Sequence, residues 1–174
     1  MALSVQEMGQ RAKKATAQVA GLSLATRNTL LKNMGAALLM RQDEIIAANQ
    51  QDLVAYGASL SRPMQKRLTL DSDALTAIAE SLAAVATLPD PLAGPYDTWE
   101  NHAGLKIVKK IVPLGVVAMI YEARPNVTVD AAALALKSGN AVILRGGKEA
   151  IHSNTVLATI LRDVLIDQNL NPDI

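Results

Sequence analysis

The segment AVILRGGKEA, residues 141–150, holds the residue types best suited to binding an anion. It opens with a short apolar run typical of a buried parallel strand, and a helical pattern follows it. Between the two stand Arg145, Gly146, Gly147 and Lys148. Open α/β sheets bind ligands at such strand ends, where glycines allow a phosphate to approach the backbone and cations supply charge. The segment predicts a nucleotide phosphate site; a surface turn with two solvated cations is the alternative.

The residue at the end of this strand also bears on the choice of nucleotide. Strands that carry an NAD ribose site often end in an acidic residue, which would repel a 2′-phosphate. Here the strand ends in Arg145, so the sequence favours NADP over NAD. The glycine spacing fits neither a P-loop nor the GxGxxG pattern, and Lys148 is followed by Glu149 rather than Ser or Thr.

A second polar cluster, YEARPN, follows another apolar strand and begins at Tyr121. Asn126 could donate an amide hydrogen bond to negative charge developing on a carbonyl oxygen, or it could cap a helix that starts at Val127. Arg124 could hold a substrate phosphate or carboxylate, or pair with Glu122. Because the carboxyl ends of parallel strands meet at one edge, we expect the two clusters to share a composite cleft.

The elements that must position these clusters fall into three parts: helices over 1–88, a connection and an edge strand over 89–113, and a βαβ unit with a further helix over 114–170. The apolar spacing before Thr87 predicts three or four helices, with Asp71 capping the last of them. Val116–Ile120 is uniformly apolar, which predicts a central strand covered on both faces. Gly139 should end the helix that follows. The pattern is α/β, the first part of a doubly wound parallel sheet.

Composition narrows the classes of function. The chain has 174 residues, is 50% hydrophobic, and carries a formal net charge of +1, which favours neither nucleic acid nor a membrane surface as a partner. No long apolar run is present, so we expect a cytoplasmic protein. Cys is absent, and the two histidines, His102 and His152, lack metal-ligand spacing, so we expect no metal site and no thiol nucleophile from these residues.

The stretch VPLGVVAMIYEARPNVTVDAAALALKSGNAVILRGGKEA resembles the gamma-glutamyl phosphate reductase family, within the aldehyde dehydrogenase-like superfamily. The helical segment DEIIAANQQD is also similar to that family's N-terminal region. The resemblance covers essentially all of the chain but less than half of a typical member. It implies an aldehyde dehydrogenase-like fold, in which N-terminal helices lead into the nucleotide-binding sheet and a Cys-bearing catalytic domain lies outside this chain.

The resemblance implies NADPH-dependent reduction of L-glutamyl 5-phosphate to L-glutamate 5-semialdehyde and phosphate in proline biosynthesis, with a functional link to glutamate 5-kinase. It implies that Asn126 helps to form an oxyanion hole, that Arg145 contacts the adenosine ribose, and that Lys148 contacts the 2′-phosphate. Glu122 and Arg124 are candidates for substrate binding. The catalytic thiol would come from outside the chain, so we expect the segment alone to be inactive.

The same resemblance implies a homo-oligomer built through a projecting β-hairpin, to which residues 104–112 would contribute. Two other functions stay open at this point. One is a related acyl-phosphate or acyl-CoA reductase with the same front half, and the other is a nucleotide-binding module without catalysis.

Overall fold

The computed structural model describes residues 3–174, and their first half is helical. The elements before residue 88 are α1 (Val5–Ala20), α2 (Leu24–Met40), α3 (Gln42–Tyr56), the 3₁₀ turn η1 (Gly57–Ser59), α4 (Arg62–Leu68) and α5 (Ser72–Thr87). The prediction of three or four helices was therefore too low for this region. A short break at η1 and a restart with Pro63 in the first turn of α4 separate helices that the apolar spacing ran together.

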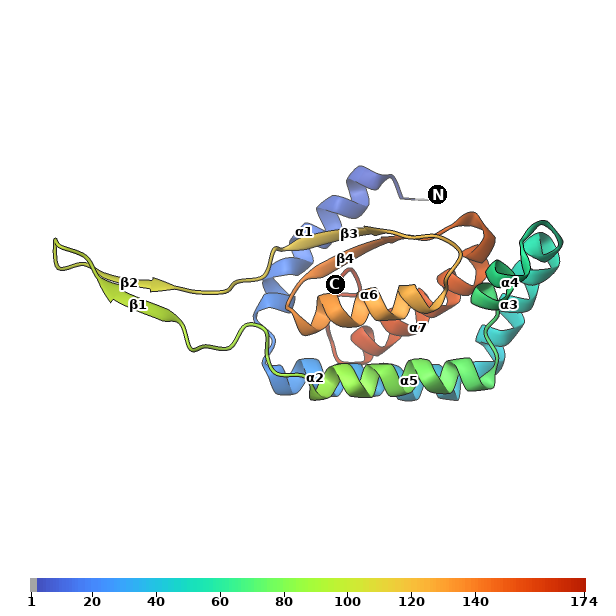
Figure 1. Ribbon diagram of the computed structural model, residues 1–174, viewed down its shortest axis with the longest axis horizontal. Helices are drawn as coiled ribbons and strands as arrows, with labels where there is room; N and C mark the ends of the chain where they lie inside the picture. Colours follow the sequence, from blue (N-terminus) through green and yellow to red (C-terminus); the bar gives the residue numbers. More distant parts are fainter. Residues whose placement is uncertain (1–2) are drawn as a thin grey trace.

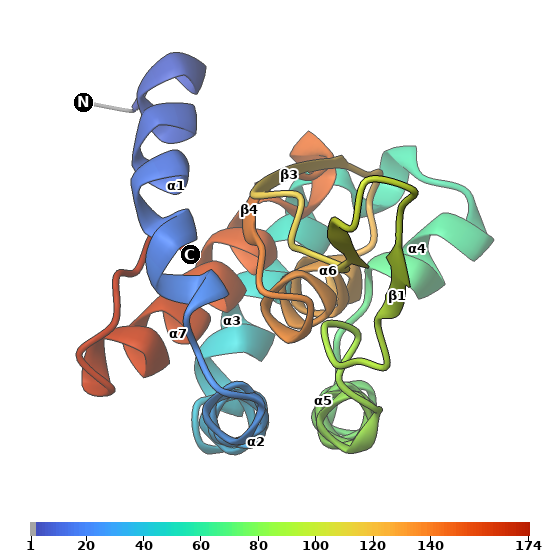
Figure 2. The same cartoon turned by 90° about the vertical axis from the view of Figure 1, so that its left-hand side faces the viewer.

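The predicted apolar stripes form the core of the helical part. Leu30, Leu31, Met34 and Leu38 of α2 are buried, as are Leu75, Ile78 and Leu82 of α5. In Figure 2, α2 and α5 lie side by side below the sheet. The Asp71 side chain accepts a 2.8 Å hydrogen bond from the backbone N–H of Ala74, so the predicted cap of α5 is confirmed.

A two-stranded hairpin extends away from the rest of the chain (Figure 1). Its strands are β1 (Asp97–Glu100) and β2 (Lys106–Lys109), which pair antiparallel. The sequence predicted only the second of these strands, because the first is polar and shows no alternation. Gly104 has φ 79° in the turn, a conformation that L side chains rarely adopt.

The second half of the chain contains the parallel pair that carries the predicted site. Its elements are β3 (Val116–Ile120), α6 (Asn126–Lys137), β4 (Ala141–Arg145), the 3₁₀ turn η2 (Lys148–Ala150) and α7 (Ile151–Asp167). Strands β3 and β4 pair in parallel, with Ile120 opposite Arg145, and α6 connects them (Figure 1). Gly139 has φ 72° just beyond α6, as predicted for the end of that helix.

The expectation that β3 would be covered on both faces was wrong for this chain. Ala118, Met119 and Ile120 are exposed, and within residues 3–174 the strand pairs only with β4. Helix α1 packs against both strands and α6 packs against β4, which leaves part of the apolar strand surface in contact with solvent. An apolar sequence predicts that a strand is buried, but the cover must come from other elements.

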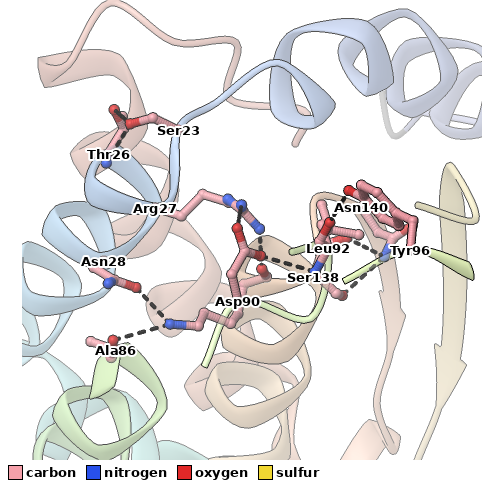
Figure 3. Close-up of polar contacts among 11 residues, drawn as sticks. Ser23, Thr26, Arg27, Asn28, Ala86, Asp90, Leu92, Tyr96, Ser138 and Asn140 are labelled. Carbon is pink, nitrogen blue, oxygen red and sulfur yellow. Dashed lines mark hydrogen bonds and ion pairs between the residues drawn. The ribbon is translucent and has the colours of Figure 1, made fainter. Parts of the chain in front are cut away.

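A buried polar cluster ties the helices to the connection before the hairpin (Figure 3). The Arg27 guanidinium donates to Asp90 at 2.9 Å and to the carbonyl of Lys137. The Lys137 ammonium donates to Asn28 Oδ1 at 2.7 Å and to the carbonyl of Ala86 at 3.0 Å. Burial, together with the nearby Arg27, lowers the pKa of Lys137. Asp90 supplies the negative charge that this arrangement requires.

We expect Asp90→Asn to lower the free energy of unfolding by about 3 kcal/mol, because it leaves the buried Arg27 and Lys137 cations facing each other without a carboxylate. Urea unfolding of the whole polypeptide measures the effect. Asp97→Asn, an exposed change on β1, is the control. Equal midpoints for the two variants would show that the buried pair contributes nothing.

None of the helices in residues 3–174 is long and apolar enough to cross a membrane.

Candidate nucleotide and acyl site

The two predicted clusters lie next to each other at the carboxyl edge of the β3–β4 pair. The backbone N–H of Tyr121 donates to the carbonyl oxygen of Arg145 at 3.0 Å, which continues the strand pairing one residue past β3. The adjacency predicted from parallel strand order is therefore confirmed at the level of the backbone.

Both glycines of the RGGK turn stand where a side chain would collide with the protein. A Cβ on Gly146 would lie 2.2 Å from the Asn154 amide nitrogen and 3.0 Å from the Tyr121 ring. A Cβ on Gly147 would lie 2.6 Å from Glu149 Oε2 and 3.3 Å from the backbone nitrogen of Ala123. A side chain at Gly146 would thus displace the Asn154 amide, whereas one at Gly147 would require the flexible Glu149 side chain to move and residues 122–123 to shift slightly.

A hydrogen-bonded chain behind the turn fixes these elements relative to one another. The Tyr121 hydroxyl lies 2.6 Å from Thr128 Oγ1, which lies 2.9 Å from Asn154 Oδ1. Burial raises the pKa of Tyr121, and the hydrogen bond to Thr128 opposes that rise. These hydrogen bonds join the end of β3 to α6 and α7. Thr128 and Asn154 were not predicted from the sequence, because polar residues inside apolar helices show no motif by which to pair them.

The N-terminus of α7 is not free to bind a phosphate. Asp52 of α3, which is fully buried, accepts hydrogen bonds from the backbone N–H groups of His152 and Ser153 at 3.1 and 2.8 Å. The Ser153 hydroxyl donates to the same carboxylate at 2.7 Å. Asn49, one turn before Asp52, also donates to Ser153 Oγ at 3.0 Å. The helix dipole is thus already matched by a carboxylate from within the chain, and any anion at this edge must rely on side-chain cations.

The two cations of the turn are available for such a role. Arg145 and Lys148 are exposed, and neither forms a salt bridge within residues 3–174. No acidic residue ends β4. The arrangement offers two unpaired positive charges at a strand end, which suits a phosphate-bearing ligand.

The Asn126 side chain does not cap α6. Pro125 holds the N-cap position, and the Asn126 amide nitrogen donates to Asp130 Oδ2 at 3.0 Å, one turn along the helix. A primary amide has two N–H groups, so one donor is left for another acceptor. The alternative of a capping asparagine is therefore wrong. The hollow next to Asn126 is lined by residues of α4, α5, α6 and the connection between α4 and α5. Arg145 and Lys148 do not line it, so this hollow is not the expected composite cleft.

Glu122 and Arg124 are exposed and lie in the loop between β3 and α6. The backbone N–H of Arg124 donates to the carbonyl oxygen of Glu122 at 2.8 Å, but their side chains form no ion pair within the described chain. Both charged groups remain free to contact a ligand.

The fold and the strand-end site together define a class of protein. The chain matches the sequence pattern of the Aldehyde dehydrogenase family over residues 2–171, and it belongs to that family. Within the family it is similar to gamma-glutamyl phosphate reductases. It is 71% identical to the gamma-glutamyl phosphate reductase of Leuconostoc citreum over 174 residues, which are the whole of this chain and 42% of the relative.

Solved structures agree with this placement. The crystal structure of gamma-glutamyl phosphate reductase from Thermotoga maritima superposes with a TM-score of 0.91 at 30% identity, over 97% of this chain and 41% of that one. The reductase from Saccharomyces cerevisiae superposes with a TM-score of 0.87 at 30% identity, over 99% and 45%. The family resemblance and the fold class predicted from the sequence are confirmed. The chain spans about two fifths of the length of these relatives.

Proposed function

We propose that this chain is the nucleotide-binding portion of an enzyme that reduces L-glutamyl 5-phosphate in the cytoplasmic synthesis of proline. The reaction consumes NADPH and a proton and yields L-glutamate 5-semialdehyde, NADP and inorganic phosphate. The observation that carries the proposal is the 71% identity to a gamma-glutamyl phosphate reductase along the full 174 residues.

The residues at the end of β4 fit a phosphorylated dinucleotide. Arg145 and Lys148 are unpaired, and the two glycines keep the turn tight against residues 121–123. The 2′-phosphate of NADP carries the negative charge that these two cations would hold. When bound, the dinucleotide supplies the hydride that reduces the acyl group.

Asn126 is proposed to act on the acyl group. Its free N–H would donate to the acyl oxygen as negative charge develops there, while Asp130 holds the rest of the amide in place. The described residues contain no cysteine, so the attacking thiol is proposed to come from the remainder of the longer polypeptide. The exposed Glu122 and Arg124 remain candidates for contacts with the substrate phosphate or carboxylate.

The β1–β2 hairpin is proposed to join subunits of a homo-oligomer. It extends from the body and carries exposed apolar side chains at Trp99 and Val108, with Ile111 and Val112 exposed just beyond it. Apolar groups on a projecting hairpin are stabilised when a second subunit covers them.

A coupled assay tests the reaction itself. The full-length polypeptide that contains this segment is mixed with glutamate, ATP, NADPH and glutamate 5-kinase, which generates glutamyl phosphate in situ. We expect NADPH oxidation that depends on the kinase. Equal oxidation without the kinase, or a preference for another acyl phosphate or an acyl-CoA, would contradict the proposed substrate.

The cofactor preference gives a separate prediction. In the full-length enzyme, Arg145→Glu is expected to weaken NADPH binding more than NADH binding, by about 1–3 kcal/mol, because one charge-assisted contact to the 2′-phosphate is lost. Fluorescence titration with each cofactor measures the difference. Arg62→Glu, an exposed change on α4, is the control. Equal loss for both cofactors would remove the 2′-phosphate role of Arg145.

A further inference from the structure

A hollow of about 310 Å³ lies beside Asn126, between α6 and the segment that joins α4 to α5. Its polar lining consists of Arg67 and Thr69 near the end of α4, Ser81 on α5, and Asn126 and Asp130 on α6. Its volume is at the small end of the range for ligand pockets, which suits a ligand the size of an amino acid.

Two opposite charges line this hollow without neutralising each other. The carboxylate of Asp130 is half-buried and accepts hydrogen bonds from the Asn126 amide at 3.0 Å and the Ser81 hydroxyl at 3.5 Å, both neutral groups. The guanidinium of Arg67 forms no salt bridge within the described chain. The Asp130 carboxylate therefore has no cationic partner within the described chain, and an ammonium group from a ligand could form a charge-assisted hydrogen bond with it.

The proposed substrate has a matching arrangement of groups. In L-glutamyl 5-phosphate, two methylene groups separate the reactive acyl carbon from a carbon that bears an ammonium and a carboxylate. Three groups line the same hollow: the proposed oxyanion donor Asn126, the carboxylate of Asp130 and the guanidinium of Arg67. A ligand whose acyl oxygen meets Asn126 would therefore carry its amino-acid end into a space with one partner for each charge.

Resting on the function proposed above, we infer that this hollow binds the amino-acid end of the acyl substrate. Asp130 receives the α-ammonium group, Arg67 receives the α-carboxylate, and both select a zwitterionic substrate over simpler acyl groups. Asp130 has a second contact that is relevant to its role, because it also holds the Asn126 amide. The test must therefore separate recognition of the ammonium group from orientation of Asn126.

The reaction run in reverse allows that separation, because aldehydes lacking one charge at a time can be used. Phosphate-dependent NADP reduction by the full-length enzyme is followed with glutamate 5-semialdehyde, with 5-oxopentanoate, which lacks the ammonium group, and with 4-aminobutanal, which lacks the carboxylate. The variants are Asp130→Asn and Arg67→Gln. Matched controls are Glu80→Gln on α5 and Lys66→Gln on α4, both exposed and outside the hollow.

Asn at position 130 keeps a side-chain carbonyl oxygen that can still accept from the Asn126 amide, but it loses the negative charge. We therefore expect Asp130→Asn to lower kcat/KM by about 100-fold with glutamate 5-semialdehyde but to leave the value with 5-oxopentanoate nearly unchanged. Arg67→Gln should lower kcat/KM by about 100-fold with the semialdehyde and leave the value with 4-aminobutanal nearly unchanged. The controls should match the parent enzyme with all three aldehydes.

Equal losses with the full substrate and the matching analogue would overturn the inference, and for Asp130 they would assign the residue only to holding Asn126. Unchanged kinetics would overturn it as well. If Asp130→Asn lowers the melting temperature, Arg67→Gln at the exposed Arg67 still tests the inference, through the comparison of glutamate 5-semialdehyde with 4-aminobutanal. A parent enzyme without NADP-dependent turnover would refute the proposed function, whereas turnover without preference among the three aldehydes would refute only this inference.

Discussion

Replacing Asn126 with Ala in the full-length enzyme is expected to lower kcat by about 10²–10³-fold while the affinity for NADPH changes little. The expectation depends on the free N–H of the Asn126 amide, since the other end of that amide is held by Asp130 at 3.0 Å. A donor fixed in advance stabilises developing charge without reorganising during the reaction. The proposed NADPH contacts are those of Arg145 and Lys148, which do not line the hollow beside Asn126.

Stability distinguishes this role from a structural one. Because Pro125 is the N-cap of α6 and the Asn126 side chain makes no cap hydrogen bond, Asn126→Ala should not show the loss of about 1 kcal/mol typical of a removed cap. Single-turnover kinetics, an NADPH titration and a thermal melt are needed together. Gln51→Ala, an exposed amide removed from α3, is the control. Unchanged turnover with a lowered melting temperature would assign Asn126 to the fold.

The helical core could be predicted from the sequence because it depends on local spacing. The stripe at Leu30, Leu31, Met34 and Leu38 is buried, and so is the stripe at Leu157, Ile160, Leu161 and Val164 of α7. Asp71 begins α5 and Gly139 ends α6 as expected, since Asp71 acts through a hydrogen bond three residues away and Gly139 through its own backbone conformation. Such features require no knowledge of distant elements.

Features that depend on distant partners were missed or misjudged. The hairpin required pairing the polar segment Asp97–Glu100 with Lys106–Lys109, and nothing in the first segment alternates. The exposure of β3 depends on which elements cover it rather than on its own residues. A strand's apolar composition indicates that cover is needed but not where the cover comes from.

In the candidate site, too, the features set by local sequence or strand order were predicted, and those that depend on distant residues were not. The adjacency of residues 121–126 to the RGGK turn follows from parallel strand order, and the backbone contact between Tyr121 and Arg145 bears it out. The cap that Asp52 places on α7 links residues 100 positions apart, so it could not be predicted from the sequence. Arg67 escaped notice for the same reason, because only the packing of α4 and α5 near α6 brings it close to Asn126.

A polypeptide consisting of these 174 residues alone is expected to have no reductase activity. Covalent reduction of an acyl phosphate by this route requires a thiolate, and the sequence contains no cysteine. A Ser or Thr hydroxyl is a poor substitute at neutral pH without an activating base. The expected loss is therefore complete, larger than that caused by any single substitution proposed above.

Structure adds a second reason, which concerns association rather than chemistry. Ile120 is 75% exposed and Leu114 is 88% exposed, and β3 pairs on one side only within the described residues. An apolar cavity of about 250 Å³ also opens beside β4 and α7. Exposed apolar surface next to an unpaired parallel strand favours aggregation or partial unfolding over a stable free monomer.

Expression of the segment alone tests both reasons in one preparation. NADPH oxidation is measured with glutamyl phosphate generated in situ, and hydrodynamic size and a thermal melt are recorded on the same sample, with the full-length enzyme as the positive control. Turnover without a cysteine would overturn the thiol mechanism. A monodisperse monomer that melts cooperatively would leave the chemistry intact, but it would show that β3 and the cavity beside β4 need no further cover, because the exposed apolar surface would then be tolerated by a folded chain.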